Sequence, residues 1–81
     1  MDQNSAVQIA QQNRQQQNVA PNFSVASAER RIIELPQAPP ASPSPVRDVL
    51  VWVVRFVFQD FWVDLAVDNS TGAIVRRDQS R

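Results

Sequence analysis

The sequence predicts a small α+β fold, in which a disordered N-terminal arm and a proline-rich spacer precede one amphipathic helix and a C-terminal β-hairpin. Three observations predict it: a start rich in Gln and Asn, a cluster of prolines in the middle, and a concentration of large apolar residues after them. We divide the chain into a flexible arm (1–35), a proline-rich linker (36–45) and an interaction module made of the helix and the hairpin (46–81).

The arm is expected to be disordered because it is too polar to fold by itself. Residues 1–22 are rich in Gln and Asn, and such tracts bury too little apolar surface to offset the entropy of ordering. A helix drawn through 6–17 has an apolar side too narrow to dock. The apolar residues between 23 and 35 are expected to form a short docking element, which is either a helix or a strand over 31–35.

The linker PQAPPASPSP contains five prolines in ten residues, from Pro36 to Pro45. This composition is typical of a semi-rigid polyproline II spacer that extends by about 3 Å per residue. Its last residues also supply a helix start, with Ser44 as the N-cap and Pro45 at the first helical position.

The apolar stretch that follows is expected to be a helix over about 45–59. With a helical period, Asp48, Arg55 and Gln59 share one narrow edge and the apolar side chains cover the opposite side. The many valine and aromatic residues favour a strand instead. A strand, however, would be apolar on both faces, and no turn signal separates Phe58 from Phe61. We therefore expect periodicity to prevail over propensity.

The C-terminal segment predicts a β-hairpin over about 61–68 and 73–77. Apolar and polar residues alternate in FWVDLAVD, which is typical of a half-buried strand. The sequence DNSTG then provides turn residues, and Gly72, the only glycine of the chain, can adopt the positive φ that a turn requires.

A single helix on two strands buries too little core to be stable alone, so the apolar helix face is expected to bind a partner. We interpret the chain as a non-enzymatic structural or assembly subunit that binds another protein, or a second copy of itself, through the apolar face of residues 46–67. The expected interface residues are Val49, Leu50, Trp52, Val53, Val54, Phe56, Val57, Phe58, Phe61 and Trp62.

Composition argues against several other classes of function. The chain has no Cys and no His, and its eight basic and eight acidic residues balance. Thiolate and imidazole chemistry is therefore excluded, and no basic patch indicates nucleic-acid binding. Asp60, Asp64 and Asp68 recur at a spacing of four, but we expect them to be solvated rather than catalytic. We predict no enzyme activity, no cofactor, no metal and no small-molecule substrate.

A transmembrane helix is not expected, because the longest uninterrupted apolar run, Val49–Val54, has six residues and a span needs about 20. The alternative function is a membrane-peripheral regulatory protein whose amphipathic helix lies at the lipid interface. The polar start of the chain has no signal-peptide pattern, so we expect a protein that is cytoplasmic or part of a larger particle.

The segment VDNSTGAIVRR resembles the Asp-x-x-Thr-Gly hairpin of flagellar FlaG-type proteins and of PepSY-type domains. The resemblance to FlaG-type proteins implies a variable polar arm before a helix and strands. The second hairpin of FlaG-type sequences has no counterpart in this sequence, and we assign no family.

Overall fold

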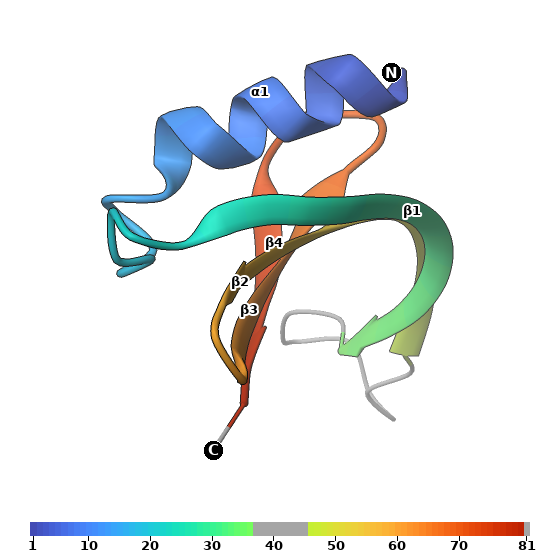
Figure 1. The fold of residues 1–81 in the computed structure, drawn as a ribbon. Helices are drawn as coiled ribbons and strands as arrows, with labels where there is room; N and C mark the ends of the chain where they lie inside the picture. Colours follow the sequence, from blue (N-terminus) through green and yellow to red (C-terminus); the bar gives the residue numbers. More distant parts are fainter. Residues whose placement is uncertain (37–45, 81) are drawn as a thin grey trace.

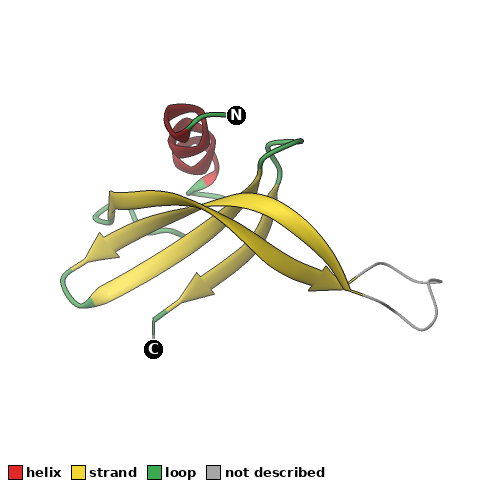
Figure 2. Cartoon of the chain, turned by 90° about the vertical axis from the view of Figure 1, so that its right-hand side faces the viewer, coloured by secondary structure: helices red, strands yellow, loops and turns green. Residues whose placement is uncertain are grey.

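A computed structural model describes residues 1–36 and 46–80 of the chain. It contains helix α1 (Gln3–Asn13) and strands β1 (Ser24–Pro36), β2 (Val46–Phe58), β3 (Phe61–Asp68) and β4 (Ile74–Gln79). The strands form one antiparallel sheet in chain order, and α1 lies across one of its faces (Figures 1 and 2). The protein is thus mostly β, and the expected fold, with a disordered arm and a central helix, is wrong.

The main correction concerns residues 46–58, which form strand β2 and not a helix. Six of its thirteen residues are valine, which favours a strand. Both faces of the strand can be apolar because each of them packs against other parts of the chain. On one face, α1 covers Val54 and Phe56. On the other, the far ends of β1 and β2 bend together (Figure 1), and Val49 and Val51 are buried in a second, smaller apolar cluster.

The three polar residues that suggested a helix occupy three unrelated places along a strand and its turn. Arg55 forms an ion pair with Asp64 on β3. Asp48 lies opposite Glu34 near the far end of β1 and β2. Gln59 lies in the turn between β2 and β3. Their helical spacing therefore does not reflect a shared polar face.

The turn between β2 and β3 consists of Gln59 and Asp60 only, because Phe58 and Phe61 are already paired. Gln59 has φ +55°, a conformation that Gly and Asn adopt far more readily than Gln. The turn was missed because its residues are not those that usually mark a hairpin.

The C-terminal hairpin is present, with β3 over Phe61–Asp68 and β4 over Ile74–Gln79. The side chain of Asp68 accepts hydrogen bonds from the backbone N–H groups of Ser70 and Thr71, at 2.7 and 3.2 Å. Gly72 has φ +77° and donates its N–H to the backbone oxygen of Asp68 at 2.8 Å. The turn is therefore built by the Asp and the Gly that predicted it.

Helix α1 is docked onto the sheet rather than disordered. Asp2 caps it by accepting the N–H of Ser5 at 2.8 Å, and this hydrogen bond lowers the pKa of the Asp2 carboxyl group. Ala6 and Ala10 are fully buried against the sheet. Because alanine side chains are short, the helix backbone can approach the strands closely.

Two arginines fix the connection between α1 and β1. The guanidinium group of Arg14 lies 5.1 Å from the ring centre of Phe56 and donates hydrogen bonds to the backbone oxygens of Ala20 and Phe23. Arg77 on β4 donates to the backbone oxygen of Gln17 at 2.6 Å. The arm was expected to be disordered because the sheet that supplies its apolar surface and its polar partners was itself not predicted.

The main core lies between α1 and the sheet. Its buried residues come from the helix, from the connection that follows it and from the three strands that the helix crosses: Ala6, Ala10, Val19, Ala28, Val54, Phe56, Val63, Leu65 and Val67. The proposed linker over 36–45, including the cap formed by Ser44 and Pro45, lies outside the described residues apart from Pro36, which ends β1.

Candidate functional site

The residues expected to form an interface are divided between the two faces of the sheet. Those with even numbers on β2 lie on the face that carries α1, and those with odd numbers lie on the opposite face. Most of them are core or half-buried. Val49, Val54 and Phe56 are buried, Trp52, Val53, Val57, Phe58 and Trp62 are half-buried, and Leu50 and Phe61 are exposed.

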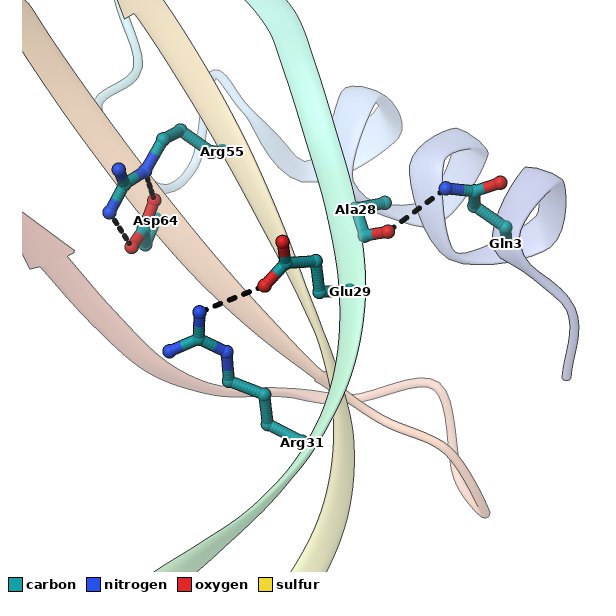
Figure 3. A network of polar contacts seen from close by, with 6 residues as sticks. All are labelled: Gln3, Ala28, Glu29, Arg31, Arg55 and Asp64. Atoms are coloured by element: carbon teal, nitrogen blue, oxygen red, sulfur yellow. Dashed lines mark hydrogen bonds and ion pairs between the residues drawn. The ribbon is translucent and has the colours of Figure 1, made fainter.

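The sheet face opposite α1 carries the ion pairs of the described residues. Glu29 and Arg31 pair along β1 at 2.8 Å, and Arg76 and Asp78 pair along β4 at 2.9 Å. Between them, Arg55 contacts both carboxylate oxygens of Asp64 at 2.8 and 2.9 Å (Figure 3). Each of these six charged side chains therefore has an oppositely charged partner on the same face.

The Arg55–Asp64 pair is the most constrained of the three. The guanidinium group also stacks on Trp62, with its central carbon 4.4 Å from the ring centre. The hydrogen bonds that Arg55 donates to Asp64 raise the pKa of Arg55, and the negative charges of Asp64 and Glu29 act in the same direction. Arg55 therefore stays positively charged and links β2 to β3 through its ion pair with Asp64.

The three aspartates at a spacing of four do not form a carboxylate cluster. Asp60 lies in an exposed turn, Asp64 is paired with Arg55, and Asp68 accepts two amide hydrogen bonds of its own turn. Within residues 1–36 and 46–80, no group of three or more acidic side chains is placed to hold a metal ion.

The feature that stands out is the free edge of the sheet along β1. The strand order places β1 and β4 at the two edges, and β1 has 13 residues against 6 in β4. An edge strand exposes unpaired backbone N–H and C=O groups, which can pair with a strand of another chain. The residues of β1 that expose these groups are those whose backbone N–H and C=O point away from β2.

Two hydrogen bonds establish that direction. The side-chain amide of Gln3 donates to the backbone oxygen of Ala28 at 2.9 Å, from the side of β1 away from β2 (Figure 3). On the neighbouring strand β2, the backbone oxygen of Leu50 accepts the N–H of Asn69 at 3.0 Å, so the backbone groups of Leu50 point away from β1. Leu50 is opposite Ile32 in the β1–β2 register. That pair therefore exchanges no backbone hydrogen bonds, and the N–H and C=O of Ile32 point outward.

Because alternate residues of a strand point to opposite sides, Arg30, Ile32 and Glu34 all present their backbone groups at the edge. No other described residue forms a hydrogen bond to these backbone groups. We call this stretch, together with the side chain of Leu50, the β1 edge site.

The side chains of the β1 edge site are apolar in the middle and charged at both ends. Ile32 is 71% exposed and Leu50, directly opposite on β2, is 41% exposed. On one side of this pair, Arg30 lies over Trp52 at 5.7 Å from the ring centre. On the other side, Glu34 lies opposite Asp48. An adjacent pair of exposed aliphatic side chains flanked by opposite charges is a candidate recognition surface.

Sequence reasoning listed Leu50 among the interface residues of 46–67, and it placed Ile32 only in the short docking element expected between 23 and 35. The signal for β1 was weak because ERRIIEL has three charged residues in a row and then two isoleucines, so charged and apolar residues do not alternate. A strand over 31–35 was one of two options for this segment, and the strand in the structure is longer, Ser24–Pro36.

Comparison of the chain with family models, with curated proteins and with solved structures gave no match. Among the described residues, the only helix, α1, is too short and too polar to cross a bilayer.

Proposed function

We propose that this chain is a non-enzymatic structural or assembly subunit that binds another protein chain by adding one of its strands to the β1 edge site. The observation that carries the proposal is the environment of Ile32. Its side chain is 71% exposed and its backbone groups point outward, next to the exposed Leu50. Strand addition satisfies both the apolar and the hydrogen-bonding groups of such an edge.

The stretch from Arg30 to Glu34 lies between two protected positions of β1. Before it, Gln3 occupies the backbone oxygen of Ala28. After it, Pro36, the last residue of β1, has no N–H to offer. Natural proteins protect their edge strands with such devices, so the unprotected stretch from Arg30 to Glu34 supports a binding role.

This proposal keeps the class of function that the sequence suggested but moves the contact surface. Val54 and Phe56 are buried under α1 and cannot bind a partner without unfolding. Of the residues expected at the interface, Leu50 lies in the β1 edge site. The membrane-peripheral alternative depended on an amphipathic helix over 45–59, and residues 46–58 are a strand.

The proposal is tested by photo-crosslinking in the native source, with a photoreactive amino acid at Leu50. We expect a crosslinked protein adduct that is lost when Ile32→Pro is added, because proline removes the outward N–H while leaving the β2 ladder intact. The same probe at Gln11, on the exposed side of α1, serves as the control and should give no adduct. An adduct from Leu50 that persists in Ile32→Pro, or adducts from Gln11 alone, would contradict strand addition at this edge.

A further inference from the structure

We infer that the partner at the β1 edge site is a second copy of this chain, paired antiparallel to the first about a two-fold axis at Ile32. This inference rests on the proposed function, since it names the partner of the same site. Three independent features of β1 support it: the directions of its backbone groups, the order of its charges, and the positions at which its edge is closed.

The backbone directions restrict how two copies of β1 can pair. The outward groups belong to Ala28, Arg30, Ile32 and Glu34, which are every second residue. A hydrogen-bonded antiparallel pair needs outward groups on both strands at the same position. A two-fold axis that passes between two residues would place outward groups opposite inward ones. The axis must therefore pass through a residue.

The charges then select which residue lies on the axis. An axis at Arg30 or at Arg31 would place two guanidinium groups directly opposite each other, which is unfavourable. An axis at Ile33 would place Arg30 opposite Pro36, whose missing N–H breaks the hydrogen-bonded pair. An axis at Ile32 places Ile32 opposite its own copy.

With the axis at Ile32, Arg30 of each copy lies opposite Glu34 of the other. Both side chains are on the face that carries α1, as are Ile32 and Leu50. The four aliphatic side chains, two from each copy, form one continuous apolar strip between two opposite-charge pairs. Cross-strand pairs of opposite charge and of aliphatic side chains both stabilise a sheet.

In this arrangement, the two protected positions of the edge, Ala28 and Pro36, also lie opposite each other. The backbone oxygen of Ala28, which Gln3 already occupies, lies opposite Pro36, which has no N–H to donate to it. The paired stretch therefore extends from Arg30 to Glu34 and ends where each copy is already protected. The bend of β1 in Figure 1 is compatible with the pairing, because a two-fold rotation about the sheet normal preserves the direction of bending.

The dimer should be weak and reversible. Such an edge contact is smaller than the roughly 800 Å² per partner of a standard stable interface. We expect a dissociation constant on the order of 10 µM to 1 mM.

The test uses two charge reversals that each disrupt the dimer alone but restore it when mixed. In Arg30→Glu, the introduced carboxylate faces Glu34 of the second copy, and in Glu34→Arg, the introduced guanidinium group faces Arg30 of the second copy. We expect each variant alone to raise the dissociation constant about tenfold or more in sedimentation equilibrium. A mixture of the two should form heterodimers with about the wild-type constant, because both pairs are then opposite in charge. Asp60→Arg, a charge reversal in the exposed turn, is the control and should leave dimerisation unchanged.

The outcomes distinguish this inference from the proposed function. Wild-type protein that stays monomeric up to about 1 mM, or a mixture that associates no better than the separate variants, would overturn pairing with a second copy. If the Leu50 crosslink then contains a different protein and still depends on Ile32, strand addition stands and only the identity of the partner is wrong. If the crosslink does not depend on Ile32, both fail.

Discussion

Arg55 and Asp64 connect the two central strands through a two-point contact. Both nitrogens of the contact lie within 2.9 Å of a carboxylate oxygen, and the Asp64 side chain is 15% exposed. Planar, paired contacts of this kind are stronger than single contacts between mobile surface charges. The pair also keeps Arg55 over Trp62, on the sheet face opposite α1.

We predict that Asp64→Ala lowers the free energy of unfolding by about 1 kcal/mol, because Arg55 loses its partner in a partly shielded site. The matched control is Arg76→Ala, which breaks an ion pair whose two side chains are both 49% exposed. That change should stay within about 0.5 kcal/mol of wild type. Urea unfolding followed by tryptophan fluorescence measures both. Equal effects of the two substitutions would show that Arg55–Asp64 is no more than a surface pair.

Among the elements, the β2–β3 turn has the residue least suited to its backbone conformation. Gln59 has φ +55°, and a left-handed conformation costs a residue with a side chain roughly 1–2 kcal/mol. The turn consists of two residues, so no neighbouring loop residue can absorb the change of direction. The strain is tolerated because Phe58 and Phe61 on either side are already paired.

We predict that Gln59→Gly raises the free energy of unfolding by about 0.5–1 kcal/mol, since relief of the positive φ exceeds the entropy cost of glycine. The control is Asp60→Gly in the same turn, where φ is not positive and glycine only adds flexibility. That variant should be less stable than wild type by about 0.5–1 kcal/mol. Thermal unfolding of the two variants side by side gives the comparison, and destabilisation by both would rule out strain at Gln59.

The elements also differ in how well the sequence predicts them. The C-terminal hairpin was predictable because its strand alternates and its turn contains Asp68 and Gly72 at the positions where the structure uses them. Strand β2 was not, because a strand covered on both faces has no alternation, and its three polar residues happened to match a helical period. Without β2 there is no sheet, so neither the docking of α1 nor the free edge of β1 could be foreseen.

At the scale of the whole molecule, one face of the sheet is covered by α1, the other carries paired charges, and the edge along β1 is open between two protected positions, Ala28 and Pro36. The exposed pair of Ile32 and Leu50 lies beside this opening. The apolar surface that the sequence assigned to a helix face is therefore mostly internal. The part that stays exposed coincides with unpaired backbone, and this coincidence is the basis for proposing that the molecule associates by strand addition.

Residue-resolved amide hydrogen exchange along β1, at low and at high protein concentration, tests this account most directly. In dilute solution, the inward-pointing amides of Arg31 and Ile33 should exchange slowly, and the outward-pointing amides of Arg30, Ile32 and Glu34 should exchange fast. At millimolar concentration, we expect the three outward amides to become protected as the edges pair. Uniform protection along β1 in dilute solution, or outward amides that still exchange fast at millimolar concentration, would contradict the account.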